Sequence, residues 1–215
     1  MAAAPACAQN AARGNMTGFS TNLTDVSEKN APSSLVRDHL FAARTVLVFG
    51  EVTTALAESV SAQLLALAER SADPIRIVIH SQGGHVESGD TIHDVIRFIA
   101  PEVRVLGTGW VASAGALIFA AAHRENRFAL PNTRFLLHQP LGGVGGPASD
   151  VEIEVRQILE MRQRLNGIFA RATGQTLDKI ASDTERNHWM NAEEARAYGL
   201  VGSIVESAAE LTRAA

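Results

Sequence analysis

Cysteine, aromatic residues and long apolar runs are all scarce in this 215-residue chain. Its single cysteine, Cys7, excludes a disulfide within the chain and fits a reducing compartment, so we expect the protein in the cytoplasm. No apolar run approaches the roughly 18 residues that a membrane span requires. The opening residues Met1 to Gln9 lack the basic and leucine-rich parts of a secretion signal.

An excess of positive charge and internal repeats are also missing. The formal net charge of −4 provides no basic surface for nucleic acid or for an anionic membrane, so neither is an expected partner. Without a repeat, a solenoid is excluded. Because 46% of the residues are hydrophobic and 20% are charged, the chain has enough apolar surface for one substantial core.

The first 33 residues differ in composition from the rest. They are rich in Ala, Asn, Ser and Thr and have no periodic apolar positions, which predicts a mobile tail over residues 1–33. Met16, within this tail, is an alternative start of translation. Residues 34–215 are predicted to form a single domain.

Strand and helix signals alternate through the first half of this domain. Apolar runs at 45–50, 75–79 and 103–106 predict strands, and helices are predicted after each: one capped by Thr53 or Thr54, one over 86–100 and one over 114–122. This order predicts right-handed crossovers and a largely parallel sheet, and hence an α/β fold. Short strands at 127–130 and 134–137 follow, joined by a turn at 131–133. The predicted core-facing helix positions are Leu56, Val60, Leu64, Leu67, Ile92, Val95, Ile96 and Ile99.

The clearest helical signal covers residues 149–173. Ser149 and Glu152 predict a capping box at its start, and Gly174 predicts its end. Glu152 with Arg156, and Glu160 with Arg164, are spaced as ion pairs on the polar side. The opposite side carries an apolar stripe of Val151, Val155, Ile158, Leu165 and Phe169.

Ser113 occupies the junction between a predicted strand and an alanine-rich helix. Unpaired N–H groups at a helix start favour negative charge, so an oxyanion could be held at this position. The segment is not the G-x-S-x-G turn of α/β-hydrolases, because Val111 replaces the first glycine. Taken alone, Ser113 is open to two interpretations, a reactive serine or a helix N-cap.

Two glycines end the strand that begins at residue 75. Gly83 and Gly84 allow the backbone to turn its N–H groups into a crevice, at the sheet edge where α/β folds bind ligands; an ordinary tight turn explains the pair equally well. His80 and His85 flank them, but without a third ligand two histidines do not predict a zinc site.

Several motifs occur together in an order that resembles the proteolytic subunits of the Clp protease family. They are His-Ser-Gln-Gly-Gly (80–84), Ala-Ser-Ala-Gly (112–115), Leu-Pro-Asn-Thr-Arg (130–134), His-Gln-Pro-Leu-Gly-Gly (138–143), Asp-Thr-Glu-Arg (183–186) and Ala-Tyr-Gly-Leu-Val (197–201). The resemblance runs from about Arg44 to Val205. It implies a crotonase-like α/β spiral and a serine endopeptidase built as two stacked seven-membered rings. Unfolded proteins and peptides, delivered by an AAA+ unfoldase ATPase, are the implied substrates.

The same resemblance implies the roles of individual residues. Ser113 corresponds to the nucleophile and His138 to its general base, and the backbone N–H groups of Gly84 and Ala114 to the oxyanion hole. An acyl-enzyme then forms and water releases it. This scheme requires neither a metal nor an organic cofactor.

The third triad position departs from the family pattern. Asn187 stands where the family has an aspartate, in the segment Asp183-Thr184-Glu185-Arg186-Asn187. An asparagine carbonyl can orient the histidine but carries no charge to stabilise an imidazolium. Asp183 or Glu185 could supply that charge, and His188 is a competing base.

Assembly and docking features are implied as well. The helix over 149–173 and a strand over 142–146 correspond to the handle between the rings, across which Arg186 could pair. Val78, Phe98 and Phe128 match the apolar ATPase-docking groove, whereas Arg76 replaces a frequent tyrosine, and the usual charged N-terminal motif has no counterpart. The rings could contain one kind of subunit or two. Trp110 and Trp189 are interpreted as packing residues.

Two other functions stay open at the level of sequence. A weakly active or non-catalytic paralogue could co-assemble with an active Clp subunit, because Asn187 replaces the acid. A crotonase-type acyl-CoA enzyme would share the fold and the backbone oxyanion hole, but Ser113 and His138 occupy the peptidase positions.

Overall fold

The computed structural model describes residues 33–213. The predicted tail therefore lies outside the described residues, apart from Ser33, and so do Cys7 and Met16. The chain divides into two compact units, Met1–Arg37 and Asp38–Ala215. The second unit contains the sheet, the core and every candidate site residue.

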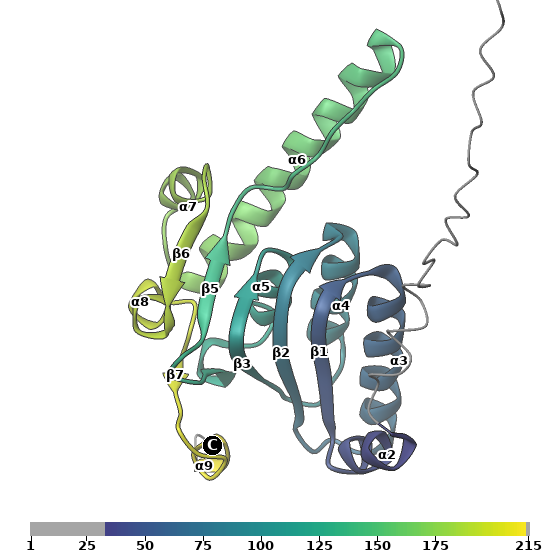
Figure 1. Ribbon diagram of the computed structural model, residues 1–215, viewed down its shortest axis with the longest axis vertical. Helices are drawn as coiled ribbons and strands as arrows, with labels where there is room; N and C mark the ends of the chain where they lie inside the picture. Colours follow the sequence, from purple (N-terminus) through teal and green to yellow (C-terminus); the bar gives the residue numbers. More distant parts are fainter. Residues whose placement is uncertain (1–32, 214–215) are drawn as a thin grey trace, which may run out of the picture. The chain divides into compact units, whose positions relative to one another are not determined.

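In the first half of this unit, strands and helices alternate as predicted (Figure 1). In order, the elements are α2(Ser34–Ala42), β1(Thr45–Val52), α3(Thr54–Arg70), β2(Ile75–Gly84), α4(Val86–Phe98), β3(Val103–Ala112), α5(Ala114–Phe119), a 3-10 turn η1(Arg124–Asn126), β4(Arg127–Ala129), β5(Arg134–Leu137), α6(Ala148–Thr173), α7(Leu177–Asp183), β6(His188–Asn191), α8(Ala192–Tyr198), β7(Ser203–Ile204) and α9(Glu210–Arg213). No helix in this part of the chain is long and apolar enough to cross a bilayer.

The sheet is largely parallel, which confirms the predicted α/β class. Its main path is β1-β2-β3-β4-β7, and all of these neighbours pair in parallel. Helices α3, α4 and α5 lie against β1, β2 and β3. Every second side chain of β2 is buried, because period-two alternation directs one face of the strand into this core.

The helix boundaries follow from local chemistry. The Thr53 side chain caps α3 by accepting the N–H of Leu56, so the first of the two predicted caps is confirmed. Helix α4 ends at Phe98, two residues before the predicted end. Pro101 accounts for this difference, because a proline disfavours helical backbone in the residue before it.

The two predicted short strands are present but do not pair with each other. Strands β4 and β5 both pair in parallel with β3, at successive positions along it. Strand β5 then pairs antiparallel with β6. It ends at Leu137, so the next residue, His138, emerges beside the end of β3.

Helix α6 begins one residue earlier than predicted, and the predicted capping box is wrong. Pro147 occupies the N-cap position with no side-chain cap, because Ser149 already lies inside the first turn. The predicted end is confirmed, with Gly174 in the left-handed region at φ 77°. Arg156 pairs with Glu152 as expected.

The predicted Glu160–Arg164 pair is also wrong. Arg164 instead binds both carboxylate oxygens of Asp90 on α4, at 2.5 and 2.7 Å, while Glu160 accepts a hydrogen bond from Gln157. A bidentate partner on a neighbouring helix outcompetes a partner on the same helix because it makes two charge-assisted hydrogen bonds.

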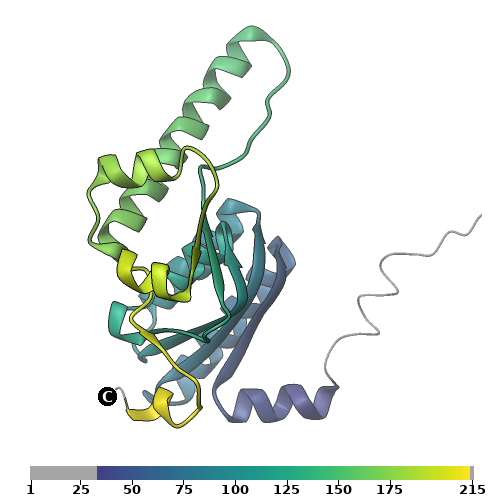
Figure 2. The same cartoon turned by 60° about the vertical axis from the view of Figure 1, so that its left-hand side comes forward.

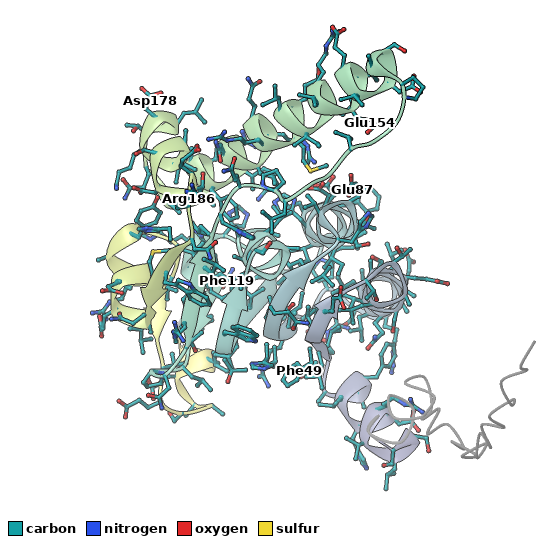
Figure 3. All side chains as sticks on the ribbon, turned by 45° about the horizontal axis from the view of Figure 1, so that its top comes forward. Phe49, Glu87, Phe119, Glu154, Asp178 and Arg186 are labelled. Carbon is teal, nitrogen blue, oxygen red and sulfur yellow. The ribbon has the colours of Figure 1, made fainter. Side chains whose placement is uncertain are left out.

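The first half of α6 projects away from the sheet, with the connection from β5 running beside it (Figures 1 and 2). Ile153, Val155 and Leu159 are exposed there, and Glu154 marks this outer end in Figure 3, whereas Leu165 and Phe169 belong to the core. The predicted strand over 142–146 is wrong for this chain. Among the described residues no strand lies beside it to complete a ladder.

Candidate active site

Ser113 lies at a strained turn between β3 and α5. Its backbone has φ 55° and ψ −122°, and it is one of two non-glycine residues with positive φ in the described part of the chain. A hydrogen bond of 2.9 Å from its N–H to the carbonyl of Leu136 holds the turn. Although Ser113 occupies the N-cap position of α5, its side chain makes no capping hydrogen bond. The hydroxyl is therefore free for another partner.

That partner is His138. Ser113 Oγ lies 2.8 Å from His138 Nε2, within ordinary hydrogen-bond distance, and both residues are partly buried. Sheet pairing explains the contact, because β3 and β5 run side by side in parallel and each ends just before one of the two residues. The structure thus brings together the predicted nucleophile and the predicted base.

His138 remains neutral more readily than a histidine in water. Burial lowers its pKa below the ordinary 6.5, while a side-chain hydrogen bond with Asn187 acts in the opposite direction. Desolvation disfavours the charged imidazolium, so the ring keeps a free nitrogen at neutral pH. A neutral ring can accept the proton of a serine hydroxyl.

The two carboxylates that could replace the missing acid are engaged elsewhere. Asp183 binds Lys179 at 2.8 Å and accepts from the Tyr198 hydroxyl at 2.7 Å. Burial tends to raise the pKa of Asp183, but these hydrogen bonds outweigh burial and lower it. Glu185 pairs with Arg162. Asn187 lies along the same groove as His138, and its side chain acts on the pKa of that histidine.

The competing base and the tryptophans have packing contacts. His188 lies against the ring of Tyr198, with a centroid separation of 5.3 Å. Trp189 stacks on Trp110 at 6.3 Å and lies under the guanidinium of Arg134 at 4.4 Å. The two tryptophans pack on each other at the surface, where Trp110 is 39% and Trp189 is 37% exposed. It is His138 rather than His188 that contacts the serine.

Gly83 has a steric role at the site that sequence reasoning did not reveal. A Cβ atom on Gly83 would lie 2.5 Å from Ser113 Cβ, closer than real Cβ contacts come, so only glycine permits this approach. Gly84 has φ 153°, and a Cβ there would meet the Val52 carbonyl oxygen at 2.5 Å. The Gly83 N–H donates to Ser81 Oγ at 3.1 Å. The two glycines therefore allow the end of β2 to pack closely against Ser113 on one side and against the backbone of Val52 on the other. The sequence pattern, which indicates only a turn, did not reveal this.

Two hollows adjoin the Ser113–His138 pair. The smaller, about 20 Å³, is lined mainly by apolar side chains, among them Val86, Leu117 and Phe169. The larger, about 350 Å³, is open and lies along His138, Leu141 and Asn187, with Arg186 at its side. Figure 3 shows Arg186 in the segment between α7 and β6. The site thus combines a small apolar pocket at the serine with an open groove at the histidine.

The histidines beside the glycines have local partners. His80 Nδ1 lies 3.2 Å from the Thr108 carbonyl, and His85 contacts Ser88 and Glu87. Within residues 33–213 no three His, Cys, Asp or Glu side chains are grouped closely enough to hold a metal ion.

Comparison with known proteins identifies the family of the chain. The family described as Clp protease matches residues 28–208. The chain belongs to the Clp protease family. An "ATP-dependent Clp protease proteolytic subunit 2" of Gluconobacter oxydans is 58% identical over 89% of this chain and 86% of that protein. An "ATP-dependent Clp protease proteolytic subunit 3" of Rhizobium meliloti is 55% identical over 88% of this chain and 99% of that protein.

Solved structures agree. A point mutant of ClpP1 and ClpP1 itself, both from Listeria monocytogenes, are 52% identical to the chain and align with TM-scores of 0.77 and 0.74. Each alignment covers 82% of this chain and 99% of the solved one. The predicted Clp protease fold is thereby confirmed.

One expected family feature needs correction. Phe128, a predicted lining residue of the apolar docking groove, is fully buried against Val205 and Leu211. Of the other groove positions, Phe98 is 80% exposed and Val78 is partly buried. The C-terminal residues cover Phe128 because Val205 and Leu211 are themselves apolar and gain from being buried against it.

Proposed function

We propose that this Clp protease family member is a serine endopeptidase that hydrolyses unfolded proteins and short peptides. The observation that carries the proposal is the 2.8 Å contact between Ser113 Oγ and His138 Nε2 at a strained turn. A serine is nucleophilic only beside a base, and strained backbone at such a contact is typical of functional residues. The hollow beside Ser113 is lined mainly by apolar side chains, but its volume of about 20 Å³ has room for little more than one water-sized group.

The reaction follows from these groups. His138 Nε2 takes the proton of Ser113 while Oγ attacks the peptide carbonyl, and the backbone N–H groups of Gly84 and Ala114 stabilise the oxyanion. The helix start favours this role for Ala114, because the first N–H groups of α5 have no acceptor within the helix. His138 then protonates the leaving amine, and the same ring activates the water that releases the acyl group.

Asn187 orients the histidine in this scheme without adding charge. Its side chain interacts with His138, and this interaction would hold the ring with Nε2 facing the serine. The imidazolium that forms in the transition state lacks the support of Asp183 and Glu185, because both bind other groups. The chain is therefore proposed to be active but slower than a subunit with an aspartate.

Replacing Asn187 with aspartate is expected to raise kcat/KM on a fluorogenic peptide by about 10²-fold. A carboxylate stabilises the imidazolium; in a serine-protease triad the reverse change costs about 10⁴. Asn187→Ala is expected to lower kcat/KM by about 10-fold, because it removes one hydrogen bond. Sedimentation checks that particle size is unchanged. If Asn187→Ala equals the wild type, Asn187 is not the third member.

The pH profile provides a second measurement on the same ring. Activity requires neutral His138, and burial lowers its pKa, so kcat/KM is expected to fall only below an apparent pKa that is less than 6.5. Asn187→Asp adds a negative charge, which raises the pKa and moves this acidic limb to higher pH. An unchanged limb in Asn187→Asp would mean that residue 187 does not act on the titrating group.

Assembly and partners belong to the same proposal. The relatives are named as subunits of an ATP-dependent protease, which supports stacked seven-membered rings and an AAA+ ATPase partner for this chain. Arg76 and the buried Phe128 support a weaker or altered docking groove. The proposed location is the cytoplasm, and the subunit composition of the rings is left to the assembly experiment.

The direct test compares substrates. Purified full-length protein is expected to hydrolyse short fluorogenic peptides and to leave acyl-CoA thioesters and enoyl-CoA unchanged. Release of the fluorophore with multiple turnovers supports the peptidase. Turnover of the CoA substrates without peptide hydrolysis would overturn it in favour of the crotonase-type enzyme, which the named relatives do not favour.

A further inference from the structure

Another cavity, separate from the two hollows beside Ser113 and His138, lies between the C-terminal ends of α5 and α6 and the start of β4. Its volume is about 520 Å³, which lies within the range of small-molecule sites. Ala120, at the end of α5, and Ala172, near the end of α6, form part of its wall. The charged or titratable groups that line it are Arg97, Arg124, Arg127, Arg171, His93, His123 and Glu125.

Arg127 is the most unusual of these residues. It is only 2% exposed, and one of its nitrogens, Nη2, donates to the Ala172 carbonyl at 2.6 Å. The other two, Nε and Nη1, are buried without any hydrogen-bond partner. Burial, and then the charge of Arg124, lower the pKa of Arg127 to about 10. A buried guanidinium with two unpaired N–H donors lowers the stability of the fold unless an acceptor binds to them.

The rest of the lining does not provide that acceptor. Within residues 33–213, no ion pair joins Arg97, Arg124 or Arg171 to a carboxylate, and Arg97 makes one 3.3 Å hydrogen bond to the Ala121 carbonyl. His93 lines the cavity, but its partner Asp94, the next residue of the same helix, does not. Glu125 is the one acidic side chain of this lining and shares it with four arginines. The cavity therefore carries an uncompensated positive charge.

We propose that this cavity binds a phosphate-bearing polyanion of the size of a di- or triphosphate. Each phosphate group brings up to two negative charges and several acceptor oxygens, and planar guanidinium groups bind phosphate oxygens in pairs. A single carboxylate ligand could not balance four arginines opposed by one glutamate. The exposed Arg97, Arg124 and Arg171 supply adaptable donors around the cavity, and the buried Arg127 adds a fixed positive charge behind them.

The test is calorimetric titration of the full-length protein with sodium tripolyphosphate at constant ionic strength. We expect saturable binding of one anion per chain, with inorganic phosphate binding more weakly. The double variant Arg124→Gln/Arg171→Gln should bind at least about 10-fold more weakly, because two charge-assisted contacts are lost. Both changes are at exposed positions, so the fold is retained. Arg196→Gln, an exposed arginine paired with Glu193, is the matched control and should bind normally.

A titration with ATP distinguishes the source of the phosphates. ATP binding more tightly than tripolyphosphate assigns the site to nucleotides, and equal affinity assigns it to free polyphosphate; either result supports the proposal. The absence of saturable binding, or equal binding by the double variant, would overturn it. A third outcome would also overturn the proposal: the wild type binds no anion, and the double variant no longer assembles. That result would mean that a carboxylate of a second copy of the chain occupies the cavity.

Discussion

Peptide hydrolysis is expected to fall by at least about 10³-fold when Ser113 or His138 is replaced with alanine, because the pair acts as one unit. Their 2.8 Å contact is the means by which the hydroxyl loses its proton during attack. For the same reason Ser113→Ala/His138→Ala should be no slower than either single variant. The measurement is kcat/KM on a fluorogenic peptide, with circular dichroism and sedimentation to check each variant.

Ser182→Ala is the matched control, since Ser182 is an exposed serine on α7. It should retain wild-type kcat/KM. Losses that multiply in the double variant would show that Ser113 and His138 act independently, which contradicts a nucleophile activated by a base.

Assembly is expected to fail when the outer half of α6 becomes charged. Ile153 and Leu159 are 57% and 51% exposed, and burying such a side chain in an interface contributes about 1.5–3 kcal/mol. A double-ring particle would repeat this contact many times. The double variant Ile153→Asp/Leu159→Asp should therefore split such a particle into rings or smaller species, with activity falling in step.

Sedimentation velocity measures this outcome, and Glu154→Gln on the same outer segment is the control that should remain assembled. We expect a loss of assembly, not a gain, because exposed apolar patches of this kind mark interaction surfaces. A wild-type protein that sediments as a compact monomer would contradict both the handle and the proposed ring assembly.

Strands β1 to β5 could be predicted from the sequence because each contains an apolar run. Strands β6 and β7 were not predicted, because their four and two residues contain no such run. Strands β2 and β3 nevertheless extend to Gly84 and Ala112, well beyond their apolar runs, because pairing with neighbouring strands continues into polar positions. The strand predicted over 142–146 shows the converse. A strand requires a neighbour, and this chain alone supplies none in its described part.

The candidate site was predicted mainly through the family resemblance. Spacing along the chain cannot bring Ser113 and His138 together; the parallel pairing of β3 with β5 does so. The steric reason for Gly83 also appears only in three dimensions. Nor does the sequence reveal that Arg127 is buried with two unpaired donors, because an arginine at the start of a predicted strand is typical of an ordinary surface residue.

The most direct test of the proposed nucleophile is labelling with a fluorophosphonate probe, followed by peptide mapping. One modified residue, Ser113, is expected, because only a serine beside a neutral histidine and unpaired backbone donors is nucleophilic enough at neutral pH. Labelling should disappear in both Ser113→Ala and His138→Ala. Modification that persists in Ser113→Ala, or that maps to another serine of the wild-type chain, would contradict the assignment of Ser113 as the nucleophile.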